Sequence, residues 1–142
     1  MKIAVVGSRD FKRLDAVRQF IWEQERTTVI VSGGAAGVDQ VALSEARRLG
    51  MPYEMYTPDW LRHGKRAGAI RNREIVEKSD EVVAFWDGRS NGTKITIDMA
   101  QAAGKRLRVW SAESTSLVEP SQRVSSSASS RSDVLGTPEP ER

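Results

Sequence analysis

The chain has 142 residues, which is enough for one small folded domain. It contains no cysteine and one histidine, which excludes a disulfide framework, a thiolate nucleophile and a metal site built from His and Cys. The first 110 residues carry a net charge of +5 and the last 32 a net charge of −2. A moderate positive charge fits an anionic small ligand and nucleic acid about equally well. The apolar run at residues 3–6 is too short for a signal peptide or a membrane span, so we expect a cytoplasmic protein.

Short β-branched runs alternate with segments of helical periodicity along the first 110 residues. This pattern is typical of repeated βα units on a parallel sheet. Strands are predicted at Lys2–Val6, Thr28–Val31, Tyr53–Tyr56, Glu81–Phe85 and Leu107–Trp110. Helices are predicted around Leu14–Ile21, at Val38–Leu49, at Ala67–Lys78 and from Gly92 to Ala103. The expected fold class is therefore α/β: a Rossmann-like three-layer sandwich, with a mostly parallel five-stranded sheet and helices on both of its faces.

Two segments depart from this alternation. About sixteen residues around the basic run Arg62–Arg66 show no clear periodicity, which indicates a functional loop rather than a simple connector. From Ser111 onward Ser, Pro, Glu, Thr and Arg dominate, and such a segment buries too little apolar surface to offset its ordering entropy. The predicted organisation is one domain over residues 1–110 and a disordered tail over 111–142.

Two glycine clusters follow predicted strands, where the ligand crevice of an open parallel sheet lies. The first is Ser32-Gly33-Gly34-Ala35-Ala36-Gly37, and the second is Asp87-Gly88-Arg89-Ser90-Asn91-Gly92-Thr93. Glycines let the backbone approach a ligand closely, and the N–H groups at the start of the following helix can bind phosphate. One such turn is as easily a purely steric feature, but two in one small domain favour a phosphate site. Neither has the spacing of a dinucleotide fingerprint or a P-loop.

Further candidates share the same edge of the predicted sheet. Gly7-Ser8-Arg9 ends the first strand and offers a hydroxyl and a guanidinium, and Arg71-Asn72 opens a later helix, from which Arg71 could form a fork onto a phosphate. Asp39, Glu45 and Asp98 carry carboxylates that could bind a ribose hydroxyl or act as a base, and Asp39 and Asp98 are the candidate catalytic residues. An Asp39 that simply complements the helix dipole, and arginines on a solvated face, stay open as alternatives. No metal site is expected.

Five motifs, taken in order around the strand ends, carry a family resemblance. They are Gly7-Ser8-Arg9-x-Phe11, Val31-Ser32-Gly33-Gly34-Ala35-x-Gly37-Val38-Asp39, Pro58-x-Trp60, Ala67-Gly68-x-x-Arg71-Asn72 and Ala84-Phe85-Trp86-Asp87-Gly88-x-Ser90-x-Gly92-Thr93. Over residues 1–110 the chain resembles the YspA, YpsA-related branch of the SLOG superfamily. The resemblance implies a Rossmann-like fold and a site for nucleotides, among relatives that include the LOG phosphoribohydrolases and the DNA-processing protein DprA.

The resemblance bears on catalysis as well. In LOG enzymes the loop similar to 87–96 supplies a glutamate that supports cleavage of the nucleoside bond, and Thr96 stands at that position here. A hydroxyl cannot replace a carboxylate as acid or base near neutral pH. Arg71 falls where LOG enzymes keep an arginine, so the resemblance implies binding rather than that hydrolysis.

We therefore expect a binding domain for a nucleotide or a nucleotide derivative such as ADP-ribose, acting as a sensor, with no certain cofactor. One alternative is a hydrolase of an N-glycosidic or phosphoester bond that uses Asp39 or Asp98. Another is single-stranded DNA binding through the cations Arg62, Lys65, Arg66, Arg71 and Arg73. A homodimer stays open, and no membrane partner is expected.

Overall fold

The structure, a computed structural model, describes residues 1–111 and 117–118. Its strands are β1 (Lys2–Gly7), β2 (Val29–Ser32), β3 (Tyr53–Met55), β4 (Glu81–Trp86), β5 (Arg106–Ser111) and β6 (Leu117–Val118). Its helices are α1 (Leu14–Trp22), α2 (Val38–Arg48), α3 (Trp60–His63), the 3-10 turn η1 (Gly64–Arg66), α4 (Ala67–Lys78) and α5 (Asn91–Ala102). None of the helices in this part of the chain is long and apolar enough to cross a bilayer.

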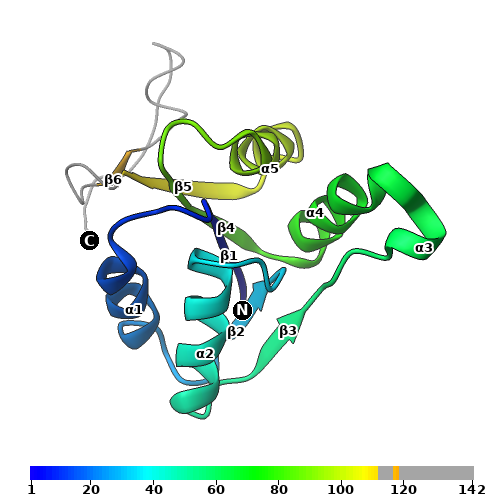
Figure 1. Ribbon diagram of the computed structural model, residues 1–142. Coiled ribbons are helices and arrows are strands. Elements are labelled where there is room, and N and C mark those ends of the chain that lie inside the picture. Colours follow the sequence, from blue (N-terminus) through cyan, green and yellow to red (C-terminus); the bar gives the residue numbers. More distant parts are fainter. Residues whose placement is uncertain (112–116, 119–142) are drawn as a thin grey trace.

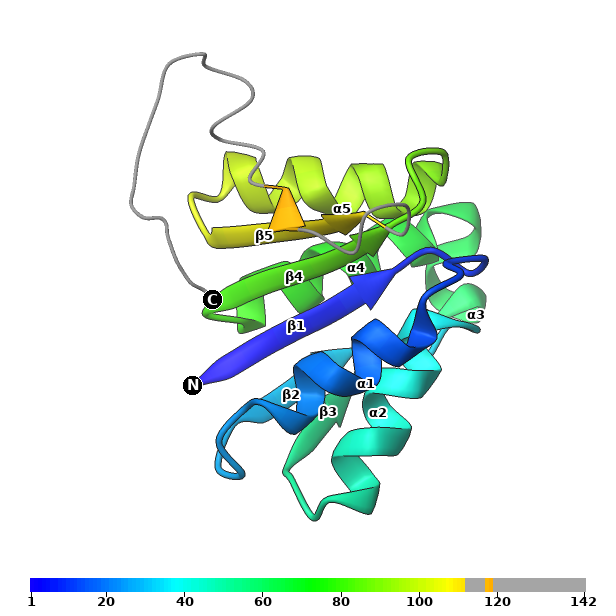
Figure 2. The same cartoon turned by 90° about the vertical axis from the view of Figure 1, so that its left-hand side faces the viewer.

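The sheet has the order β3-β2-β1-β4-β5-β6, and every pair from β3 to β5 is parallel. Helices α1 and α2 lie on one side of this sheet and α4 and α5 on the other, so the fold has three layers (Figure 1). The arrowheads of β1, β4 and β5 point the same way, which brings the loops that follow β1 and β4 to one edge (Figure 2). The predicted Rossmann-like α/β class is confirmed.

Two apolar cores hold the layers together, and the alternation of side chains along the strands separates them. Val5 and Phe85 face α1 and α2, where Phe85 makes edge-on ring contacts with Phe11 and Phe20. The neighbouring residues of β1 and β4, such as Val6 and Ala84, face α4 and α5. Because both faces of the central strands are buried, these strands read as continuous apolar runs in the sequence.

Two segments differ from the prediction. The stretch expected to be an irregular loop contains α3 and η1, and the Asp59 carboxylate caps α3 by accepting the Arg62 N–H at 3.1 Å. The segment expected to be a disordered tail contributes β6, which pairs antiparallel with β5 through Val109 and Trp110. The rest of that predicted tail lies outside the described residues.

Candidate ligand site at the strand ends

The candidate residues gather where β1, β2 and β4 end. Since β1 leads to α1 on one face while β4 leads to α5 on the other, the gap between these two strands is the topological switch point of the sheet. Ligands of open α/β sheets bind at such a point. Gly7 ends β1 and Ser8 follows it, and the sheet order places the turn after β2 on one side of them and the turn after β4 on the other.

The turn after β2 is closed by a carboxylate of the chain itself. Asp39, in the first turn of α2, is 5% exposed, and its Oδ2 accepts the N–H groups of Gly33 at 3.2 Å and Ala35 at 3.4 Å. Gly33 belongs to the glycine cluster for which the sequence predicts a phosphate site. Asp39 therefore acts as an internal anion that holds the turn in shape, and its Oδ2 is not turned outward toward a ribose.

Arg71 of α4 crosses to the same turn. Its Nη1 donates to the Gly33 carbonyl at 2.9 Å and to the Tyr56 carbonyl at 3.4 Å, while its Nε donates to Asn72 Oδ1 at 2.8 Å. A Cβ on Gly33 would lie 2.5 Å from Arg71 Nη1 and 3.1 Å from Asp39 Oδ2, so only glycine lets these three groups meet. The predicted residues Gly33, Asp39, Arg71 and Asn72 are thus brought together.

The electrostatics of Asp39 follow from this environment. Burial raises the pKa of its carboxyl group to about 6 by disfavouring the charged form. The N–H of Ala35, the Arg71 guanidinium and the N–H groups of Gly33 and Gly7 all lower it, but they do not cancel the effect of burial.

The turn after β4 is built from hydroxyl groups. Ser8 Oγ, which is buried, lies 3.4 Å from Thr93 Oγ1 and accepts the Asp87 N–H at 3.1 Å. Ser90 Oγ lies 3.2 Å from the same Thr93 hydroxyl and caps α5 by accepting the Thr93 N–H at 3.4 Å. These contacts join the end of β1 to the start of α5 across the switch point.

Asp87 shapes this second turn. Its Oδ1 accepts the N–H groups of Arg89 and Ser90, both at 2.8 Å. Desolvation acts to raise the pKa of Asp87, but these two donors, together with the Ser8 hydroxyl, hold it below its usual value. Gly88, with a φ of +81°, provides the bend between Asp87 and Arg89. Asn91 and Gly92 are exposed at the start of α5, where the first N–H groups of a helix have no intrahelical partner.

At two positions the backbone packs too closely against its neighbours to leave room for a side chain. A Cβ on Gly37, whose φ is +86°, would collide with the Arg9 carbonyl, so the turns after β1 and β2 touch through their backbones. A Cβ on Gly7 would lie 2.5 Å from the Phe85 carbonyl oxygen and 2.7 Å from Val38 Cβ. These glycines position the site through packing.

Several predicted residues lie apart from these contacts. Asp98 is exposed on α5 and forms an ion pair with Lys94 at 2.9 Å. Ser32 donates its hydroxyl proton to the Val5 carbonyl inside the sheet at 2.6 Å. Thr96 is 3% exposed, and its hydroxyl donates to the Gly92 carbonyl at 3.1 Å within α5. The Arg9 side chain is exposed, so its backbone is the part that meets the neighbouring turn.

Sequence reasoning missed two contributors to the site. Tyr56 supplies a carbonyl to Arg71, and the Met55 sulfur would lie 2.8 Å from a Cβ on Gly34. Met55 ends β3 and Tyr56 follows it. The position of β3 beside β2 was therefore the signal that could have placed both residues near the site. A backbone carbonyl carries no residue-type signal, which is why the role of Tyr56 could not be read from the sequence.

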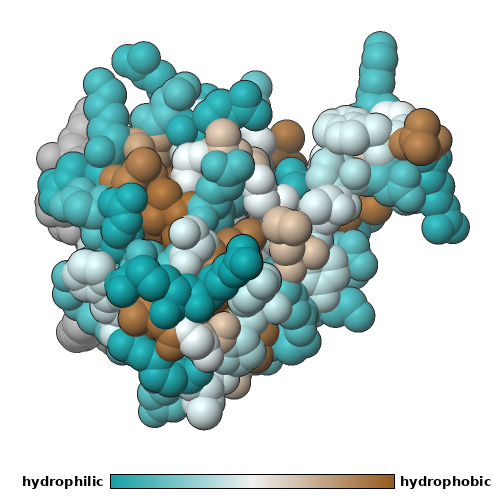
Figure 3. Space-filling model, turned by 60° about the horizontal axis from the view of Figure 1, so that its bottom comes forward, coloured by the Kyte–Doolittle hydropathy of each residue, from teal (hydrophilic) through white to brown (hydrophobic). Residues whose placement is uncertain are grey.

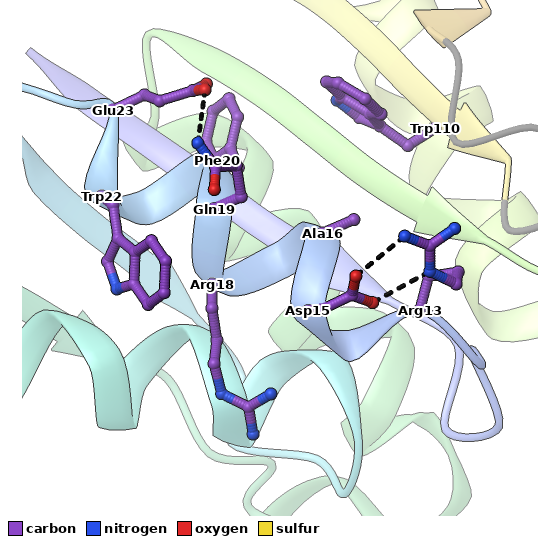
Figure 4. A pocket seen from close by; sticks show the side chains of 9 residues that line it. All are labelled: Arg13, Asp15, Ala16, Arg18, Gln19, Phe20, Trp22, Glu23 and Trp110. Carbon is purple, nitrogen blue, oxygen red and sulfur yellow. Dashed lines mark hydrogen bonds and ion pairs between the residues drawn. The ribbon is translucent and has the colours of Figure 1, made fainter.

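An open hollow lies elsewhere, between α1 and Trp110 of β5 (Figure 4). Ion pairing and hydrogen bonding on its rim join Arg13 to Asp15 and Gln19 to Glu23. None of the predicted site residues lines this hollow. The candidate site at the strand ends and the hollow beside α1 are therefore separate features.

The fold is similar to that of DNA processing protein A from Streptococcus pneumoniae, with a TM-score of 0.64 and 25% identity over 78% of this chain and 49% of that one. It is also similar to the same protein from Helicobacter pylori, with a TM-score of 0.60 and 23% identity over 78% of this chain and 65% of that one. The chain thus spans about half to two thirds of these proteins, which share its SLOG-type Rossmann-like fold.

The family follows from the sequence comparisons. Residues 1–63 match the model of the YspA, cpYpsA-related SLOG family. The gene 61 protein of Mycobacterium phage D29 is 36% identical over 113 residues, which cover 72% of this chain and 90% of that protein. The chain belongs to the YspA, cpYpsA-related SLOG family, as its motifs predict.

Proposed function

We propose that the chain binds a nucleotide or a nucleotide derivative such as ADP-ribose at the switch point, and that it acts as a sensor. The observation that carries the proposal is the cluster of three hydroxyls beside the N-terminus of α5, in which Thr93 Oγ1 lies 3.4 Å from Ser8 Oγ and 3.2 Å from Ser90 Oγ. Hydroxyl and backbone N–H donors at a helix N-terminus suit a phosphate group. The proposed phosphate site is the turn after β4, because the turn after β2 already holds the Asp39 carboxylate.

Retention of the ligand, rather than its hydrolysis, is supported by Thr96. Its hydroxyl is buried and bonded to the Gly92 carbonyl, so it offers no acid or base to a bound nucleoside. Arg71 adds a cation at the turn after β2, 2.9 Å from the Gly33 carbonyl. A ligand phosphate could draw part of this guanidinium away from the carbonyl, since charge-assisted hydrogen bonds are stronger than neutral ones.

Thermal unfolding of the full chain tests the proposal, with AMP, ADP-ribose, NAD and cyclic nucleotides each added separately. A ligand that binds only the native state at 100 times its Kd stabilises it by about 2.7 kcal/mol. For a domain of this size that is a rise in Tm on the order of 10 °C. The rise should be lost in Thr93→Val and reduced in Arg71→Ala, but kept in the matched control Arg73→Ala, because Arg73 is exposed.

One combination of results would contradict nucleotide binding. If no nucleotide raises Tm, but a single-stranded oligonucleotide binds with an affinity that falls steeply with salt, the small-ligand proposal is wrong. The nucleic-acid alternative would then replace it.

One observation favours a second candidate, hydrolysis of a nucleotide bond. A buried carboxylate with its pKa raised to about 6, as at Asp39, is typical of a general acid or base. Release of free base or phosphate from AMP or ADP-ribose would be followed by chromatography. Turnover by the natural chain that disappears in Asp39→Asn, with binding retained, supports hydrolysis; equal turnover by both chains rules out Asp39 as its catalyst.

A further inference from the structure

A tryptophan at the end of β4 ties the turn that follows to an apolar core. Side chains alternate along a strand, so Trp86 faces the side of the sheet opposite to Phe85 and packs, half-buried, against the core that α4 and α5 cover. Its indole Nε1 donates to the Ser90 carbonyl at 3.0 Å. The indole N–H therefore joins the start of α5 to the sheet.

The Ser90 carbonyl does not need this donor to begin the helix. It already accepts the Lys94 N–H at 3.2 Å, which is the first hydrogen bond of α5. A carbonyl oxygen has two lone pairs, and the indole N–H of Trp86 takes the second. With two donors on one oxygen, the plane of the peptide group after Ser90 is fixed in direction.

The same peptide group carries a donor that a ligand can use. A peptide group is planar, and in its trans form the carbonyl and the N–H point in opposite directions. Because Trp86 and Lys94 hold the Ser90 carbonyl on the side of the helix, the Asn91 N–H points away from the helix at its exposed start.

Two of the first N–H groups of α5 are already bonded in the described part of the chain. The Ser90 N–H donates to Asp87 Oδ1 at 2.8 Å, and the Thr93 N–H donates to Ser90 Oγ at 3.4 Å. The N–H groups of Asn91 and Gly92 are thus the donors that remain for an anion. Of these two, the Asn91 N–H is the one whose direction the indole sets.

We propose that Trp86 is a positioning residue of the phosphate site, a role that rests on the proposed function. Its indole N–H holds the peptide between Ser90 and Asn91 so that the Asn91 N–H and the Ser90 hydroxyl face the same phosphate group. Donors that are held in place before binding lose less freedom on binding, which increases affinity. Trp86 acts through Ser90 and Asn91 rather than on the ligand itself.

Titrations with inorganic phosphate and with AMP, followed by amide chemical shifts of the labelled full chain, test this role. Trp86→Phe keeps an aromatic ring and removes the N–H donor. It should raise the Kd of both ligands about ten-fold, which is the loss expected for one hydrogen bond. Inorganic phosphate is the decisive probe, because it has no base that could stack on the ring.

Trp110→Phe is the matched control for the loss of a half-buried indole. The Trp110 Nε1 has no hydrogen-bond partner in the described part of the chain, and its ring lines the hollow beside α1 (Figure 4). This substitution also removes packing, since the ring stacks on Phe85, but it removes no contact to the turn after β4. It should leave both Kd values within about two-fold of those of the natural chain.

A second measurement needs no substitution. An anion that accepts the N–H of a peptide group polarises the carbonyl of the same group, so phosphate should strengthen the indole contact and shift the Trp86 indole N–H signal downfield. The indole signals of Trp110 and Trp60 should not shift. Trp60 belongs to the α3 arm (Trp60–His63), which projects from the body of the domain (Figure 3) and lies apart from α5 (Figure 1).

The outcomes separate the site from the role of Trp86. If neither ligand shifts the Asn91 and Gly92 N–H signals of the natural chain, the phosphate site is wrong and the role of Trp86 falls with it. If both ligands shift them, an unchanged Kd in Trp86→Phe, or an equal rise in Trp110→Phe, overturns the positioning role alone. A Trp86 indole signal that does not shift while the Asn91 signal does overturns it as well, even where Trp86→Phe fails to fold.

Discussion

The two glycine turns of this protein are similar in sequence, and they differ in the groups that hydrogen-bond to their amides and line them. In the turn after β2, the amides of Gly33 and Ala35 are held by the Asp39 carboxylate of the same chain. In the turn after β4, the Asp87 carboxylate holds the amides of Arg89 and Ser90, while the hydroxyls of Ser90 and Thr93 remain beside the start of α5. A glycine-rich turn after a strand therefore indicates a place for an anion, and that anion can belong to the protein itself.

The largest difference between the turns should be the loss of unfolding free energy when a glycine is replaced by alanine. Gly37→Ala should lower the free energy of unfolding by about 3 kcal/mol, because alanine disfavours a φ of +86° and its Cβ would collide with the Arg9 carbonyl. In the other turn, Gly92→Ala should change it by less than about 1 kcal/mol, because a Cβ there meets open space. Urea denaturation measures both values, and equal losses would contradict the close approach at Gly37.

The second difference is in the response to pH. Since burial raises the pKa of Asp39 to about 6 in the folded state, folding favours the protonated carboxyl group. Its contribution to stability is therefore fully present below pH 4 and is lost as pH rises through about 6. Relative to Asp39→Asn, the natural chain should lose about 2–3 kcal/mol of unfolding free energy between pH 4 and pH 7.

Urea denaturation at several pH values measures that loss. The variant is needed as reference because carboxylates such as Asp15 have lowered pKa values and act in the opposite sense. Asp98→Asn serves as the control, since Asp98 is exposed and lies outside both turns. A difference between the natural chain and Asp39→Asn that does not vary with pH would mean that Asp39 titrates normally.

The smallest effect concerns the hydroxyls that join β1 to the turn after β4. Ser8→Ala should cost about 1–2 kcal/mol of stability, because it removes the acceptor of the Asp87 N–H and a partner of the Thr93 hydroxyl. Ser44→Ala, at an exposed position of α2, should stay within about 0.5 kcal/mol of the natural chain. Chemical denaturation measures the free energy of unfolding of both variants. If Ser8→Ala lowers it no more than Ser44→Ala does, the hydroxyl cluster does not stabilise this turn.

Much of this architecture could be predicted from the sequence. The strands of residues 2–7 and 81–86 are buried on both faces, so their apolar runs mark them, and the glycines that follow place both turns at one edge. The α3 arm was not foreseen, because a helix of four residues capped by Asp59 is too short to show periodicity.

The contacts inside the site could be predicted only in part. Sequence placed Asp39 and Arg71 near the ligand edge, but not the direction of their side chains. Asp39 turns back onto its own loop, and Arg71 reaches a carbonyl 38 positions away. Such contacts depend on the packing of α2 and α4 against opposite faces of the sheet, and no local pattern encodes them.

The most direct test of the central claim is an amide chemical-shift titration of the isotopically labelled full chain with AMP, and separately with inorganic phosphate. If the turn after β4 holds the phosphate, the largest shifts should occur at the N–H groups of Asn91 and Gly92, at the exposed start of α5. The signals of the Gly33 and Ala35 N–H groups should shift little, because both groups already donate to the Asp39 carboxylate. Largest shifts at Gly33 and Ala35, or none at Asn91 and Gly92, would contradict a phosphate site at the turn after β4.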